Sequence, residues 1–197
     1  MQLTVESIQN QIPYYLTRAQ KEGLVKALAD FPKGMNYYTL KHDSDLLQGD
    51  GWTALQAIRF ETGERKGVQG LVLSNSCDID PQNPRAIPVR LVFVPIIKLD
   101  AYENLLKGQG IEAGSISRKI GAIREQLVTS MFFLPKGGQL NSDYIAVLDD
   151  IHAMPSNAFL NDGARKKVFT LSQAGFYLFL LKLSIHFCRF HENVARD

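Results

Sequence analysis

The stretch WTALQAIRFETGERKGVQGLVLSN, residues 52–75, decides the fold of this chain because it carries the pattern of two neighbouring strands. Its first part has a period of two, and four apolar residues are predicted to share one strand face: Trp52, Ala54, Ile58 and Phe60. Residues 61–65, ETGER, indicate a turn, and residues 67–75 indicate a second strand that is almost continuously apolar. The stretch therefore predicts a β-hairpin.

A third strand follows at VRLVFVPIIKL, residues 89–99, which is long and rich in β-branched residues. The intervening DIDPQNPR is dense in Asp, Asn and Pro and is typical of a loop. Short, turn-rich connections usually join adjacent strands. We therefore expect the segments 52–60, 68–74 and 89–97 to be consecutive antiparallel neighbours.

Helices are predicted on both sides of these strands. Residues 17–31 carry apolar side chains at helical spacing. Residues 101–107, AYENLLK, are predicted to form a short helix that Asp100 caps and Gly108 ends. A further amphipathic helix is predicted from four residues spaced by four, three and four: Ile116, Ile120, Ile123 and Leu127.

Two short strands and a long helix complete the predicted order of elements. The strands are MFFLP at residues 131–135 and DYIAVLDDI at residues 143–151. The helix occupies the C-terminal end and is apolar on almost every side between residues 176 and 190. This order predicts an α+β fold, in which helices pack on a small antiparallel sheet that is barrel-like or twisted.

The chain is expected to form a single domain over residues 1–197. Its parts are an N-terminal helical extension at 1–48, a β-rich core with inserted helices at 49–150 and a buried C-terminal helix at 168–197. A chain of this length can bury enough surface to be stable without disulfides or metals, and no cofactor or metal site is predicted.

Composition narrows the class of protein. The two cysteines lie far apart in the sequence and no secretory signal pattern opens the chain, which favours a cytoplasmic protein. A net charge of +2 predicts no strong nonspecific attraction to nucleic acid or anionic lipid. The apolar run at the C-terminal end is shorter than the ~20 residues that cross a bilayer, so no membrane association is predicted.

Polar residues recur along the C-terminal helix at intervals of four, three, four and three: Lys182, His186, Arg189, Asn193 and Arg196. We expect this stripe to be the only solvent-facing line of a helix that packs on the sheet. An alternative is a ridge that contacts RNA phosphates, with Lys182 and Arg189 as the nucleic-acid-binding cations.

Cys77 stands in the polar knot SNSCDID, where the second strand ends. A nucleophilic cysteine needs a cation, a histidine or a helix N-terminus to lower its pKa, whereas here Asp78 follows directly. Cys77 is therefore predicted to be a buried structural residue, and Ser74, Asn75 and Asp78 to hydrogen-bond the backbone at the strand end.

Short motifs in residues 49–99 resemble the MazF/PemK-like family of small SH3-like barrels, which includes toxin ribonucleases. The matching positions are Gly49-Asp50, Arg65, Leu73-Ser74 and Pro95. Two positions depart from the pattern: Val68-Gln69 replace an Arg-Pro pair, and Ile96 replaces a hydroxyl residue. The resemblance implies an SH3-like barrel, and, for a ribonuclease, Arg65 with Ser74 or Asp78 near the scissile phosphate.

Two functions remain open from the sequence. The first is a non-catalytic binding or regulatory module with a MazF/PemK-like barrel, acting in a bacterial stress or phage-defence setting. The second is a toxin-like, metal-independent endoribonuclease. The replaced positions and the near-neutral charge favour the first. The candidate partners are another protein, a second copy of this chain, or RNA.

Overall fold

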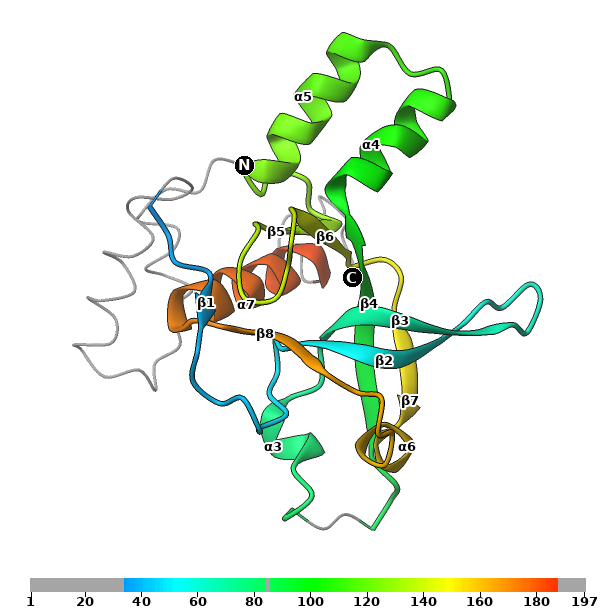
Figure 1. Cartoon of the computed structure of the whole chain (residues 1–197), viewed down its shortest axis with the longest axis vertical. Helices are drawn as coiled ribbons and strands as arrows, with labels where there is room; N and C mark the ends of the chain where they lie inside the picture. Colours follow the sequence, from blue (N-terminus) through cyan, green and yellow to red (C-terminus); the bar gives the residue numbers. More distant parts are fainter. Residues whose placement is uncertain (1–33, 84–85, 188–197) are drawn as a thin grey trace, which may run out of the picture.

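The computed structural model describes residues 34–83 and 86–187, which form an α+β fold around one antiparallel sheet (Figure 1). The strands are β1 Tyr38–Thr39, β2 Gly51–Ile58, β3 Arg65–Val72, β4 Arg90–Lys98, β5 Met131–Leu134, β6 Tyr144–Val147, β7 His152–Pro155 and β8 Lys167–Leu171. The helices are α3 Ser76–Ile79, α4 Leu99–Gly108, α5 Ala113–Arg124, α6 Ser156–Leu160 and α7 Gln173–Phe187.

The strand order is β1-β8-β2-β3-β4-β6-β5, and β7 pairs with β4 beside this path. Every pairing is antiparallel. The sheet is open, because the described strands β1 and β5 form its two edges. The α+β class and the antiparallel sheet are thus confirmed, in the form of an open sheet rather than a closed barrel.

The predicted order of the three central strands is confirmed. In the β2–β3 hairpin Leu55 lies opposite Val68, and Ile58 lies opposite Arg65. The third strand, β4, pairs with β3 over three residues only, from Gly70↔Pro95 to Val72↔Phe93. The hairpin therefore extends beyond the strand that supports it, and in Figure 1 its tip projects away from the sheet.

The predicted apolar face of β2 is wrong beyond its first residue. The register shifts between Trp52 and Leu55, where Ala54 has a φ of 61°. Such a bulge adds one residue to the strand and reverses the side-chain alternation that follows. Trp52 and Leu55 are buried as a result, whereas Ile58 is 46% exposed and Phe60 is 96% exposed.

Both helices predicted after β4 are present, and α4 ends at Gly108 as predicted, but Asp100 does not cap it. Asp100 lies in the first turn of α4, and no side chain caps that helix. Helix α5 is capped by Glu112, whose carboxylate accepts hydrogen bonds from the N–H groups of Gly114 and Ser115. It ends at Arg124, so Leu127 lies beyond it and is 51% exposed.

The two short strands predicted downstream are confirmed as β5 and β6, whereas β1, β7 and β8 were not predicted. Strand β8 occupies residues where the C-terminal helix was expected to begin, and that helix, α7, starts only at Gln173. The predicted helix at residues 17–31 lies outside the described residues.

The sheet is covered on both faces, which explains why β3 ends in a continuous apolar run. Leu71 belongs to a core cluster with Leu178 and Phe179 of α7. The next residue, Val72, belongs to a second cluster, with Phe159 of α6. A third, smaller cluster joins α4 and α5 to β5 and β6 through Leu99, Ile123, Phe133 and Ile145. Helix α7 packs on the sheet, as predicted.

Candidate functional site

The three residues proposed for catalysis do not form one site. Arg65 is the first residue of β3, and Ser74 follows the end of that strand. A strand rises ~3.3 Å per residue, so the two ends of β3, Arg65 and Val72, lie ~23 Å apart, and Ser74 follows the far end. Asp78 lies beyond Ser74, on α3. Arg65 and Ser74 therefore cannot contact the same phosphate.

The knot around Ser74 holds the end of β3. The Ser74 hydroxyl accepts a hydrogen bond from the Val92 N–H at 2.8 Å. The Asn75 side chain caps α3 by accepting from the Cys77 N–H at 2.9 Å. These bonds confirm the predicted backbone role of Ser74 and Asn75.

The prediction that Cys77 is buried is wrong. Cys77 is a free thiol and is exposed. Helix α3 has a single turn, and Ile79 is the residue that it buries. Since one helical turn presents only one side to the core, Cys77 faces solvent.

Lys182 is also placed differently from expectation. It is 4% exposed, and its ammonium group donates a hydrogen bond to the carbonyl oxygen of Gln126. Burial lowers the pKa of Lys182 to about 8. A buried side chain cannot contact RNA, so the expected solvent-facing stripe does not include Lys182. The other residue of the stripe that was proposed to contact RNA, Arg189, lies outside the described residues.

Asp50, the acidic residue of the Gly-Asp motif, forms a buried ion pair with Lys167. The Asp50 carboxylate lies 2.8 Å from the Lys167 ammonium group and accepts a hydrogen bond from the Leu47 N–H at 2.8 Å. Burial raises the pKa of Asp50, and Lys167 partly offsets this effect.

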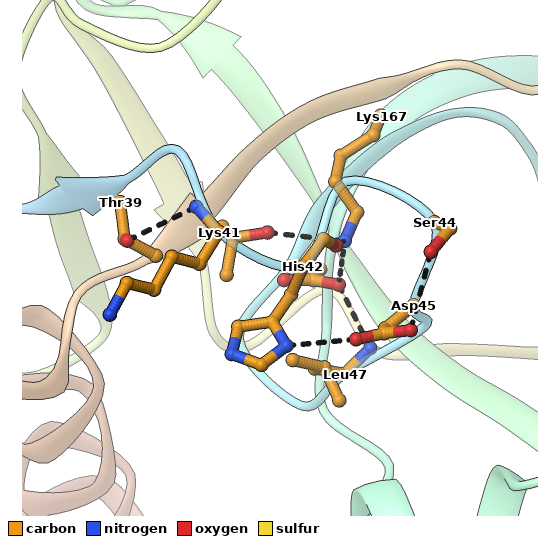
Figure 2. Close-up of polar contacts among 9 residues, drawn as sticks. Thr39, Lys41, His42, Ser44, Asp45, Leu47 and Lys167 are labelled. Atoms are coloured by element: carbon orange, nitrogen blue, oxygen red, sulfur yellow. Dashed lines mark hydrogen bonds and ion pairs between the residues drawn. The ribbon is translucent and has the colours of Figure 1, made fainter.

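Figure 2 shows how the loop from Thr39 to Leu47 gathers around Lys167. The Lys167 ammonium group also donates to the carbonyl oxygen of His42 and to the hydroxyl of Thr170. An ammonium group has three N–H donors, and the three acceptors here are Asp50, His42 and Thr170. Although Lys167 lines a cleft of about 530 Å³, its donors are therefore engaged in joining the loop to β8.

The larger cleft, about 670 Å³, opens where β3 and β4 diverge. Pairing between these strands ends at Gly70↔Pro95. Val68 and Lys66, which lie beyond that point on β3, line the cleft together with Pro95 and Ile97 of β4. We call this cleft the hairpin groove; the remaining lining residues are Ala57, Ile58, Arg59, Phe60, Glu61, Glu64, Asp150, Ile151 and His152.

The hairpin groove gathers exposed apolar side chains from three parts of the chain. Ile58 and Phe60 belong to the hairpin, and Ile97 belongs to β4. Ile151 is the residue that precedes β7. Their exposed fractions are 46%, 96%, 36% and 46%. Large contiguous patches of exposed apolar surface mark interaction sites, whereas apolar side chains exposed singly are normal, so the gathering of these four makes the cleft a candidate site. The sequence pattern missed this site because it assigned Ile58 and Phe60 to a buried face.

Two carboxylates in the groove have polar partners. Arg59 lies 3.2 Å from Glu64, and His152 lies 2.9 Å from Asp150.

Within residues 34–83 and 86–187, no three His, Cys, Asp or Glu side chains gather as metal ligands. Nor does any helix in these ranges have the length and apolar character to cross a membrane.

No model of a known protein family matches this chain. No curated protein matches its sequence either. The candidate site therefore depends on the geometry of the groove itself.

Proposed function

We propose that this chain is a non-catalytic binding module that recognises a protein partner through the hairpin groove. The observation that carries this proposal is the gathering of Ile58, Phe60, Ile97 and Ile151 at one exposed cleft. Burying such side chains against a partner removes apolar surface from water, which is the main driving force of protein association.

The distance between Arg65 and Ser74 supports a binding function over the alternative, a metal-independent endoribonuclease. In-line cleavage of RNA needs an acid–base pair and a cation around one phosphate. Arg65 begins β3, whereas Ser74 follows its other end. The binding module is thus the function that the geometry favours.

The likeness of residues 49–99 to the MazF/PemK-like family supports a bacterial stress or phage-defence setting for such a module. In this proposal β2, β3, β4 and β8 correspond to the strands of an SH3-like barrel. Here β6 and β5 continue that arrangement into an open sheet. Barrels of this kind also serve as binding modules, so the fold is compatible with the proposed function.

Site-specific photocrosslinking tests the proposal. A photoreactive residue at position 60 should capture one discrete protein in cells. The same residue at position 40 should not, although Leu40 is 90% exposed and equally apolar. The captured protein, once purified, should bind the wild type and lose at least about tenfold in affinity for a Phe60→Ser, Ile151→Ser double variant.

A ribonuclease assay tests the alternative function, the endoribonuclease. The purified wild type should leave structured and unstructured RNAs intact, with and without a chelator. Cleavage that is lost in Arg65→Ala would contradict the proposal and restore the endoribonuclease. Equal capture of partners from positions 60 and 40 would also contradict it.

A further inference from the structure

Among the described strands, none pairs with the outer edge of the first half of β3. Its residues from Arg65 to Val68 pair with β2 on one side. On the other side β4 pairs only from Gly70 onward, so no described strand pairs with the first four residues of β3. An unpaired edge presents a row of backbone N–H and C=O groups that can accept another strand.

The hairpin register identifies which of these groups face outward. The Arg59 N–H donates to the Glu64 carbonyl oxygen, so this pair is hydrogen-bonded. Hydrogen-bonded and non-hydrogen-bonded pairs alternate along an antiparallel ladder. The next hydrogen-bonded pairs are therefore Ala57↔Lys66 and Leu55↔Val68. It follows that the backbone groups of Arg65 and Gly67 point away from β2.

This edge borders the hairpin groove. Lys66 and Val68 line the groove, and Ile97 and Ile151 lie across it. Because side chains alternate along a strand, an added strand would direct every second side chain into the groove. A residue opposite Val68 would then reach apolar surface.

The charges of the edge indicate the chemistry of the occupant. Arg65 and Lys66 are exposed, and within the described part of the chain no carboxylate forms an ion pair with either. Glu64 and Asp150 have Arg59 and His152 as partners. Glu61 lies in the turn, past the end of the free edge. The edge itself therefore carries two cations, which acidic side chains complement.

A second copy of this chain fits the edge poorly. If two copies paired through this edge, a two-fold axis would relate their β3 strands. Depending on the register, Arg65 would then lie opposite Arg65 of the other copy, Lys66 would lie opposite Lys66, or the two Lys66 side chains would be diagonal neighbours. Like charges that face each other across strands destabilise the pairing. An acidic segment of another protein meets no such repulsion.

We propose that the hairpin groove binds its protein partner by strand addition. An extended segment pairs with Arg65 and Gly67 of β3, places a β-branched apolar residue opposite Val68, and carries acidic residues opposite Arg65 and Lys66. The proposal rests on the binding function proposed above and specifies how that function is carried out. Main-chain hydrogen bonds supply affinity in this recognition mode, and the groove supplies specificity.

The test uses a synthetic peptide and amide NMR of the full chain. The probe is acetyl-Val-Thr-Val-Thr-Glu-Glu-amide, and its counterpart carries Lys in place of both Glu residues. The acidic peptide should shift the amide signals of Arg65 and Gly67 and slow their exchange with solvent. The lysine peptide should bind at least about tenfold more weakly, because it meets Arg65 and Lys66 with like charge.

Two matched variants separate strand addition from other contacts. Gly67→Pro removes an outward N–H without removing a hydrogen bond of the hairpin, and should weaken binding at least about tenfold. Gly67→Ala keeps that N–H, and its added Cβ meets only the Gln56 side chain, at 3.6 Å, so binding should persist. Lys66→Glu should weaken binding. Lys41→Glu reverses the charge of an exposed lysine outside the groove and should not weaken it.

Each contrary outcome has a separate meaning. Equal binding of the peptide to wild type and Gly67→Pro would overturn strand addition, as would the absence of shifts at Arg65 and Gly67. The proposed binding function would then still stand if crosslinking from position 60 captures a partner. Single-stranded RNA that shifts the same amides and displaces the peptide would overturn the choice of a protein segment.

Discussion

The buried amine of Lys182 connects α7 to the residues that follow α5. Its ammonium group donates to Gln126, and the Gln126 side chain in turn bonds the backbone N–H and C=O of Phe133. Gln126 itself has a positive φ of 59°. Three distant segments thus meet at one polar contact inside the protein, where an unpaired charge is unfavourable.

The stability of the protein should therefore rise with pH as Lys182 loses its proton. Its pKa is about 8 in the folded state and 10.5 in the unfolded state. The folded state thus binds fewer protons between these values, so the free energy of unfolding increases as pH rises through this window. Lys182→Met should be more stable than the wild type at neutral pH, by about 1–2 kcal/mol, and this advantage should disappear above pH 10.5. Denaturant unfolding at a series of pH values measures it. A difference between the two proteins that stays constant with pH would contradict this prediction.

The Asp50–Lys167 pair should stabilise the fold only while both partners are present. Replacing Lys167 by Met leaves a carboxylate that is fully buried, and replacing Asp50 by Leu leaves an ammonium group on a side chain that is only 10% exposed. Each single change should lower the free energy of unfolding by about 3–5 kcal/mol. The double variant should cost much less than the sum, which a double-mutant cycle of chemical denaturation measures. Additive losses would show that the pair does not act as a unit.

At the scale of elements, the bulge in β2 determines which side chains are available to the groove. Because of the bulge, Trp52 and Leu55 both face the core, whereas Ile58 is exposed to solvent. The bulge includes Ala54, whose backbone is in the left-handed region. Such geometry is unfavourable for any residue with a Cβ.

Ala54→Gly should consequently stabilise the protein by about 1 kcal/mol, because glycine adopts positive φ without steric cost. Ala57→Gly provides the matched control in the same strand. Ala57 lies in the regular ladder opposite Lys66, so glycine there should destabilise by about 0.5–1 kcal/mol. Thermal or chemical unfolding of both variants distinguishes the two signs. A loss of stability in Ala54→Gly would count against strain at the bulge.

At the scale of the whole molecule, α7 closes the core over one face of the sheet. Leu178 and Phe179 lie in a cluster with residues of β3, β4, β5, β6 and β8. Figure 1 shows α7 running beside β8. The helix therefore holds together strands that are far apart in sequence.

Phe179→Ala should destabilise the protein by about 3–5 kcal/mol, since it empties a fully buried aromatic site in this cluster. Phe187→Ala is the control on the same helix. Its side chain is 53% exposed, so the change should cost about 1 kcal/mol or less. Equal losses in both variants would indicate that α7 does not close the core.

Local sequence patterns were sufficient to predict these elements: a repeat for β2 and α5, apolar or β-branched runs for β3 and β4, and end signals for α4. The strands β1, β7 and β8 were not predicted: β1 has two residues and β7 four, and β8 lies where the C-terminal helix was expected to begin. They form because distant partners complete their hydrogen bonds, as β8 does with β2 across more than a hundred residues.

The sequence by itself determined the antiparallel hairpin and the apolar character of α7. Only the tertiary structure decided the orientation of individual side chains and the location of the groove. The hydrophobic pattern of β2 could not reveal a bulge at Ala54, and the spacing in α7 could not reveal that Gln126 receives Lys182. The groove exists because β3 continues past the point where β4 leaves it, and that point is set by contacts between segments distant in sequence.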